Sequence, residues 1–276
     1  MKLSCVALLC LATLAKGQRR QIGGTDVSIS QYPFVAGILL QRTTIIGNGA
    51  ILSPNWVLTS ASAVYSTPDS DYSIATGSED LFSPAAQYQV QRIFRHPEFV
   101  GWDYNVALVQ VRGKIVFGDT VQPIAIATTD PETVNDATML SYGKNEDGTL
   151  HLRSATYTLI SDNDDCVPLL QEYQAKEVIW QHHGFCLIPP PGTQQGQWYN
   201  DAGAPLVADG QLYAVFAFAE NEGGTNEGSV ATRLTSFAEN ANTPYSFPSA
   251  TIGAPASSAH WPCSAPGGLC TQNPCS

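Results

Sequence analysis

Short apolar segments separated by turn residues fill the chain from Ile22 to about Phe237, and this feature constrains the fold most. The segments are rich in β-branched and aromatic residues, a composition typical of β-strands. The expected strands are Phe34–Leu40, Gly49–Leu52, Trp56–Ser60, Tyr88–Phe94, Val106–Val111, Ala155–Ile160, Pro205–Ala208, Gln211–Phe218 and Val230–Leu234. Asp209 and Gly210 separate two of them, which indicates a two-residue hairpin turn. With no long amphipathic helix and no internal repeat apparent, the pattern predicts an antiparallel all-β barrel or sandwich.

Composition and charge limit the classes of partner. The 276 residues are 43% hydrophobic and 13% charged, which allows a sizeable core and excludes disorder of the whole chain. Because the formal net charge is −11, phosphates repel the chain, and we expect neither nucleic acid nor a membrane as a partner. The charge favours basic partners, although serving solubility alone is an equally good explanation.

The first residues have the parts of a secretory signal peptide. Lys2 supplies the positive charge, and the apolar stretch Leu3–Leu14 is too short to span a bilayer. We therefore expect residues 1–17 to be removed and the protein to be secreted. The next residues, 18–20, include two arginines and are expected to form a short pro-segment.

The C-terminal residues 241–276 differ in composition from the rest. They are rich in Pro, Ser, Ala and Gly with almost no charge, which predicts a flexible tail. Two of the seven cysteines lie in the signal peptide, which leaves five. An odd number leaves one thiol unpaired or in an intermolecular bridge. Cys263, Cys270 and Cys275 lie in the tail, and their pairing stays open.

Six parts of the chain, in the correct order, resemble the trypsin-like serine proteases. They are Arg20–Gly24, Gln31–Phe34, the pair Gly49–Ser53 and Trp56–Ala61, Tyr104–Val109, Asn200–Leu206 and Ser229–Leu234. Each is a weak signal alone, but the ordered set spans most of the chain. The resemblance implies that residues 21–240 form two six-stranded antiparallel β-barrels with a cleft between them.

All three catalytic positions of that family are altered. The resemblance assigns Ser62 to the histidine position, Asn105 to the aspartate and Ala202 to the nucleophilic serine. A serine nucleophile needs an imidazole to take its proton, and the imidazole needs a carboxylate to orient it. Ala202 has no atom with which to attack, and Ser62 is no base at neutral pH. We therefore expect no catalytic residue and no enzyme activity.

Neighbouring positions depart from the family as well. Asn200 replaces a glycine beside the oxyanion hole, and a non-glycine residue is expected to disturb that backbone. Gly196 replaces the acidic residue of the specificity pocket, so no preference for basic side chains is implied. Trp198 and Tyr199 crowd the rim, and Ala217–Ala219 replaces the substrate-pairing strand. The aromatic residues either anchor a partner or fill a disused pocket.

The zymogen switch of the family is changed too. Asp201 is retained, but cleavage after Arg20 would expose Gln21, whose amine can be lost by cyclisation. The partner of Asp201 therefore stays open between a new amine and its own loop.

The resemblance also implies a disulfide between Cys166 and Cys186. A second family disulfide is absent, since Gly47 and Ala63 stand at its positions. The histidines at 182–183 near Cys186 raise the alternative of a zinc site. Because the disulfide would consume that thiol, we expect no metal and no cofactor.

Among inactive secreted homologues, the chain most resembles the glucanase inhibitor proteins of oomycetes. The support is the triply altered site, the opening Ile22–Asp26 with Gln31–Phe34, and the cysteine-bearing tail. The resemblance implies an effector that enters the plant apoplast and inhibits a host endo-β-1,3-glucanase. Two alternatives stay open: a regulatory pseudoprotease or decoy that captures a protease, inhibitor or peptide in the old cleft, and a carbohydrate- or wall-binding module. We assign no contact residues from the sequence.

Overall fold

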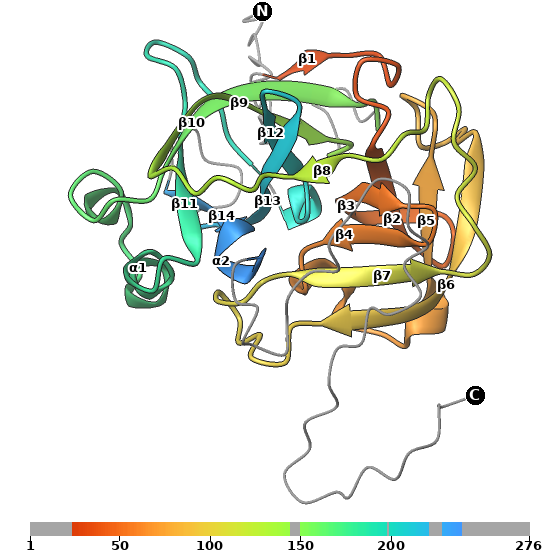
Figure 1. Cartoon of the computed structure of the whole chain (residues 1–276), viewed down its shortest axis with the longest axis horizontal. Helices are drawn as coiled ribbons and strands as arrows, with labels where there is room; N and C mark the ends of the chain where they lie inside the picture. The colour runs from red at the N-terminus through yellow and green to blue at the C-terminus, as the bar shows by residue number, and fades with distance from the viewer. Residues whose placement is uncertain (1–23, 144–149, 198, 221–227, 239–276) are drawn as a thin grey trace, which may run out of the picture.

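The computed structural model describes residues 24–143, 150–197, 199–220 and 228–238. The expected signal peptide, the pro-segment and the tail with its three cysteines lie outside these residues. Within them the chain is mostly β-strand and forms two barrels side by side, the first coloured red to yellow and the second green to blue (Figure 1).

The first barrel is a closed ring of six antiparallel strands in the order β2-β3-β4-β7-β6-β5. The strands are β2 (Val35–Leu40), β3 (Thr44–Ser53), β4 (Trp56–Thr59), β5 (Tyr72–Thr76), β6 (Ala86–Arg95) and β7 (Ala107–Val111). The ring closes where β2 pairs with β5 and places Ile38 opposite Ile74. Both side chains are fully buried in the barrel interior, together with Ile51 and Val109.

The second barrel repeats this arrangement in the order β9-β10-β11-β14-β13-β12. Its strands are β9 (Thr133–Ser141), β10 (Arg153–Ile160), β11 (Gly184–Ile188), β12 (Pro205–Ala208), β13 (Gln211–Ala219) and β14 (Ser229–Arg233). The short strands β1 (Thr25–Asp26) and β8 (Ala125–Ile126) pair with β10 and β13 from outside the ring. The two halves therefore share one strand order, although the sequence shows no repeat.

The prediction of two six-stranded barrels is confirmed, and all nine expected strands coincide with observed ones. The turn between β12 and β13 also forms as predicted, because Asp209 and Gly210 take φ angles of 49° and 73°. Strands β1, β5, β8, β9 and β11 lie outside the predicted ranges. β1 and β8 have two residues each and β5 and β11 only five, while Asn135 and Asp136 interrupt the apolar pattern of β9.

An apolar seam joins the barrels. Leu58 and Leu108 of the first barrel are buried in one cluster with Val215 and Leu234 of the second. Tyr142, which follows β9, also reaches across the seam. Its hydroxyl donates a hydrogen bond to the Ser78 carbonyl at 2.7 Å. Because burial of apolar surface is the main stabilising force, this shared cluster fixes the two barrels against each other.

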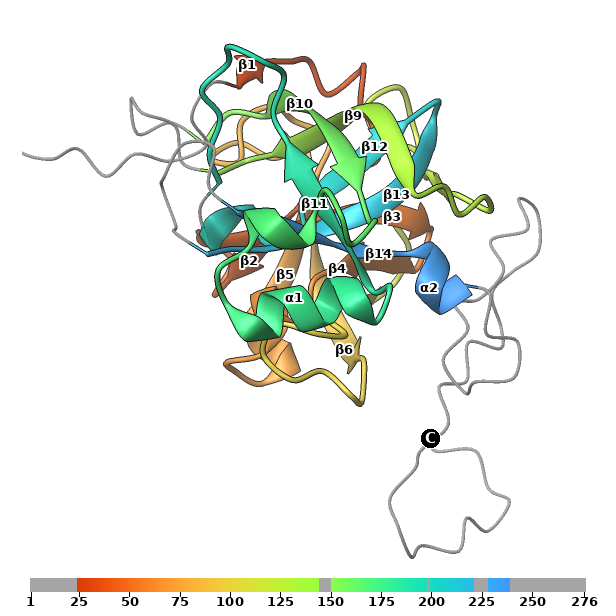
Figure 2. The same ribbon diagram turned by 90° about the vertical axis from the view of Figure 1, so that its left-hand side faces the viewer.

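Helix α1 (Tyr173–Trp180) lies on the outside of the second barrel, next to β11 (Figure 2). Its buried face packs against the Cys166–Cys186 disulfide, whose Cα atoms are 5.6 Å apart. The disulfide implied by the resemblance is therefore present. A second short helix, α2 (Thr235–Ala238), follows β14. None of the helices in the described part of the chain is long and apolar enough to cross a bilayer.

Candidate functional site

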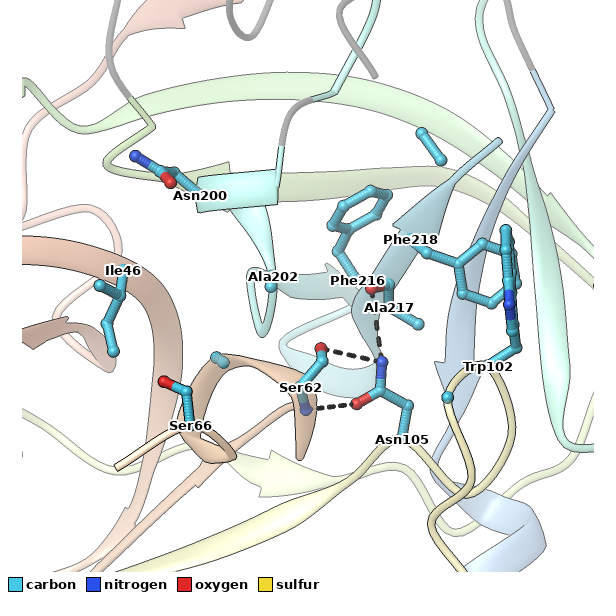
Figure 3. A pocket seen from close by; sticks show the side chains of 13 residues that line it. Ile46, Ser62, Ser66, Trp102, Asn105, Asn200, Ala202, Phe216, Ala217 and Phe218 are labelled. Atoms are coloured by element: carbon cyan, nitrogen blue, oxygen red, sulfur yellow. Dashed lines mark hydrogen bonds between the residues drawn. The ribbon is translucent and has the colours of Figure 1, made fainter. Parts of the chain in front are cut away.

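Ser62, Asn105 and Ala202 lie together where the two barrels meet (Figure 3). Ser62 begins the 3-10 helix η1 (Ser62–Val64) after β4, and Asn105 lies just before β7. Ala202 follows the 3-10 turn η4 (Tyr199–Asp201), which leads into β12 of the second barrel. All three line one cleft of about 360 Å³.

Asn105 and Ser62 form a neutral hydrogen-bond network on the floor of this cleft (Figure 3). The Asn105 side chain is 1% exposed, and its Oδ1 accepts a hydrogen bond from the Ser62 backbone N–H at 2.8 Å. Its Nδ2 donates to Ser62 Oγ at 3.0 Å and to the Ala217 carbonyl at 3.4 Å. Ser62 Oγ in turn bonds to Ser60 Oγ at 3.3 Å. The network holds no imidazole and no carboxylate.

Ala202 contributes only a methyl group, which is buried at 7% exposure. Its carbonyl accepts a hydrogen bond from the Asn48 backbone N–H of β3 at 2.8 Å. The next residue, Gly203, has a φ of 78° and donates from its N–H to the Phe216 carbonyl at 2.8 Å. The loop is thus tied to both barrels, so the methyl group is held in a fixed place.

Asp201 is fully buried, and its carboxylate accepts a hydrogen bond from Ser141 Oγ at 2.5 Å. Gly143 lies so close that a Cβ there would be 2.2 Å from Asp201 Oδ1. Asn48 Nδ2 donates both to Ser141 Oγ and to the carbonyl of Asn200. The backbone carbonyl of Asn200 is therefore hydrogen-bonded to the first barrel. Gln21, the other candidate partner of Asp201, lies outside the described residues.

Aromatic and small residues wall the cleft, and no described residue that lines it is charged. Trp102, from the loop between β6 and β7, packs edge-to-face on Phe218 of β13 with ring centroids 4.1 Å apart. Figure 3 shows this pair on one side of the cleft and Ile46 on the other, with Phe216 between them. Sequence reasoning missed Trp102, because it lies in a loop without periodicity. Its place three residues before Asn105 is the only signal that could have found it.

The region where the resemblance places the specificity pocket is only partly described. Gly196 is buried, and Gln197 Nε2 donates to the Tyr157 hydroxyl at 2.6 Å inside the second barrel. Trp198 and the side chain of Tyr199 lie outside the described residues, so their expected crowding of the rim stays a prediction.

No described histidine lines the cleft. His183 Nδ1 instead pairs with Asp103 Oδ1 at 2.9 Å, and His96 stacks on Tyr104 at 4.7 Å between centroids. Burial lowers the pKa of His96 to about 4. In the described ranges no group of three or more His, Cys, Asp or Glu side chains could hold a metal, and the sulfur of Cys186 is in the disulfide.

Gly47 of β3 and Ala63 of η1 lie side by side. A Cβ built on Gly47 would lie 2.8 Å from the Ala63 Cβ and 2.8 Å from the Ala202 carbonyl oxygen. The backbones at Gly47 and Ala63 are therefore in close contact at the place where the resemblance puts the second disulfide. Packing of the two segments holds them together there instead of a cross-link.

Two barrels of one strand order, with a cleft at their seam, define a double-β-barrel protein of the serine-protease type. The family model described as Trypsin matches residues 21–240, and the chain belongs to this family.

Curated relatives are similar at modest identity. Serine proteinase stubble of Drosophila melanogaster is 26% identical over 248 residues, which are 82% of this chain but only 31% of that protein. A trypsin of Simulium vittatum is 27% identical over 209 residues, 72% of this chain and 82% of that protein.

Solved structures show the same fold. The scabies mite inactivated protease paralogue S-D1 superposes with a TM-score of 0.67 at 25% identity, covering 78% of this chain and 93% of that one. Mouse neuropsin, with a TM-score of 0.66 at 21% identity, covers 78% of this chain and 95% of its own and shows the fold alone.

Proposed function

We propose that this protein is a catalytically inactive serine-protease homologue that acts by binding another protein. The neutral Asn105–Ser62 pair, which shares a cleft with the Ala202 methyl group, carries the proposal. Acyl transfer by this family needs a nucleophile and a base that titrates near neutral pH. Ala202 has no nucleophilic atom, and no base lies in the network to activate the Ser62 hydroxyl, whereas the scaffold and the cleft persist.

A relative supports this proposal. The scabies mite protein that superposes on this chain is itself named as an inactivated protease paralogue. The double-barrel fold thus has a solved example that carries such a name, at 25% identity to this chain.

The test of inactivity is incubation of the pure protein with peptide and ester substrates beside an active trypsin. We expect no turnover above the buffer rate. An Ala202→Ser variant is the matched control, and it should stay inactive because Ser62 and Asn105 still supply no base. Turnover by the unmodified protein that an active-site titrant abolishes would overturn the proposal.

The proposed partner is a host plant endo-β-1,3-glucanase, which the protein inhibits after secretion into the apoplast. The resemblance to oomycete glucanase inhibitor proteins supports the partner. The features of a signal peptide and the Cys166–Cys186 disulfide support export, since disulfides persist in oxidising compartments. The net charge of −11 supports association with a basic enzyme.

A panel of plant endo-β-1,3-glucanases tests this partner. Residual glucanase activity and complex formation are measured with the protein in excess, at low and at high salt. We expect inhibition that weakens as salt rises, because screening reduces attraction between the acidic protein and a basic enzyme. Full glucanase activity and no complex at low salt, across the panel, would reject the partner.

A second candidate is a regulatory pseudoprotease that captures a protease, an inhibitor or a peptide in the old cleft. The observation that favours it is the cleft of about 360 Å³ between Trp102 and Ile46, which no charged described residue lines. Competition separates the candidates: a serine-protease inhibitor peptide that displaces the partner favours the cleft. Binding to insoluble glucan alone would instead favour a wall-binding module.

A further inference from the structure

Helix α1 carries two exposed aromatic side chains on one face. Tyr173 and Trp180 are two helical turns apart, and their rings meet edge-to-face with centroids 5.6 Å apart. Their side chains are 64% and 42% exposed. The other face of α1, with Val178 and Ile179, is buried against the disulfide. We call Tyr173 and Trp180 the α1 aromatic pair.

The helix that carries the pair is held firmly. Glu220, the residue after β13, accepts hydrogen bonds from the backbone N–H groups of Gln171 and Glu172 at 2.9 and 2.8 Å. A carboxylate there satisfies amides at the start of the helix and suits the helix dipole. The Cys166–Cys186 disulfide lies under the buried face. A rigid aromatic pair loses little conformational entropy on binding, which makes it a suitable anchor.

The charge of the same segment indicates the kind of partner. Asp164, Asp165, Glu172 and Glu177 are exposed, whereas the one basic residue between 162 and 180, Lys176, is half-buried. A second copy of this acidic chain would be repelled from such a surface. A basic protein surface would be attracted to it, with faster association at low salt.

The ring geometry argues against a sugar at this surface. The planes of the two rings meet at 67°, so the pair does not present one flat face on which a sugar could stack. Tyrosine and tryptophan are instead the residue types most enriched at the energetic centres of protein–protein interfaces.

We propose that the α1 aromatic pair is the central contact through which this protein docks on a basic surface of its partner protein. The assignment rests on the proposed function, so the probe is the endo-β-1,3-glucanase. It places the docking surface on α1, away from the three altered catalytic positions.

The experiment compares Tyr173→Ser and Trp180→Ser variants with Tyr65→Ser in the full chain. Tyr65 is a matched control, since it is 69% exposed and adjoins the cleft-lining Ser66. The dissociation constant for the glucanase is measured at low salt, with thermal unfolding as the check on folding. We expect the α1 variants to bind at least about tenfold more weakly and Tyr65→Ser to bind within about twofold of the unmodified protein.

A charge reversal, Glu177→Lys, gives a second readout that does not depend on the aromatic rings. We expect it to slow association and to flatten the salt dependence of the rate. Because Glu177 is exposed, this variant tests the surface even if an aromatic variant folds poorly.

The outcomes separate the two proposals. No glucanase binding by the unmodified protein would reject the proposed partner and this assignment with it. Binding that is lost in Tyr65→Ser but kept in both α1 variants would keep the partner and reject the surface. Self-association or glucan binding that depends on Trp180 would also overturn the assignment to a basic protein.

Discussion

At the scale of single residues, the hydrogen-bond network on the floor of the cleft is neutral. Asn105 can both accept from the Ser62 N–H and donate to the Ala217 carbonyl, which a carboxylate could not do. The Asn105 amide therefore satisfies both a donor and an acceptor on the floor of the cleft.

Restoring the acid alone should destabilise the protein. In Asn105→Asp an ionised, buried carboxylate would face the Ala217 carbonyl oxygen without a donor, at a cost of about 1–3 kcal/mol at neutral pH. Burial would raise the pKa of the new carboxyl above its unfolded value. The loss should therefore be absent below that unfolded pKa and should grow as pH rises through the folded one.

Urea unfolding of Asn105→Asp and of the unmodified protein, at acidic and neutral pH, measures this difference. Asn105→Ala is the control, because it removes the same donor without adding a charge, so its deficit should not depend on pH. An equal deficit for Asn105→Asp at both pH values would contradict the explanation.

At the scale of elements, the turn between η4 and β12 holds the Ala202 position in place. Gly203 and Gly210 both have positive φ, at 78° and 73°. A Cβ on Gly203 would lie 2.3 Å from the Asn48 carbonyl oxygen and from Thr59 Oγ1, whereas around Gly210 there is open space. The first turn is therefore packed into the seam, and the second turn is free at the surface.

Replacing each glycine by alanine should separate the cost of backbone strain from the cost of steric overpacking. Gly210→Ala should cost about 1–2 kcal/mol of unfolding free energy, the penalty of a left-handed backbone alone. Gly203→Ala should cost at least about 3 kcal/mol, because overpacking is added to that strain. Chemical denaturation of both variants measures the costs, and similar values would show that the loop relaxes freely.

The Cys166–Cys186 disulfide also contributes to stability at the scale of elements. Cys166 and Cys186 close a loop with a separation of 20 residues, for which chain entropy predicts a contribution of about 3 kcal/mol. The Cys166→Ser/Cys186→Ser double variant should lose about that much stability, and a phosphine reductant should lower the melting temperature of the unmodified protein. A double variant as stable as the unmodified protein would show that packing of α1 alone holds this region.

The strand pattern and the ordered family motifs were enough to predict the barrels and to name Ser62, Asn105 and Ala202. Helix α1 was not predicted, because it has only eight residues and because the exposed aromatic residues Tyr173 and Trp180 obscure the helical spacing of its buried ones. The Trp102–Phe218 contact could not be predicted either, since it joins a loop of one barrel to a strand of the other. Contacts across the seam depend on the packing of both halves, which local sequence patterns do not encode.

At the scale of the whole molecule, the seam holds a titratable group. His96 is 5% exposed, stacks on Tyr104 of the first barrel and contacts Phe237 of helix α2. Burial lowers its pKa to about 4, despite the opposing effect of Glu98 and Asp103 nearby. The stability of the joined barrels is therefore coupled to pH.

Acid should weaken the protein through His96. Its folded pKa lies below the unfolded value of 6.5, so the unfolded chain binds the proton more readily. The contribution is fully present above pH 6.5 and is lost as pH falls toward about 4, for a total of about 3 kcal/mol. A His96→Gln variant should flatten the fall in unfolding free energy between these values, and an unchanged slope would exclude His96 as the cause.

Among the described residues, the disulfide lies in the second barrel. The first barrel has no cross-link and is held by packing, including the contact between Gly47 and Ala63. If a protease cut the chain between Cys166 and Cys186, the disulfide would keep the two fragments covalently linked. Helix α1 lies between the two cysteines, so a molecule cut there would keep the α1 aromatic pair attached to the second barrel. A cut in the first barrel would instead leave two fragments with no covalent link between them.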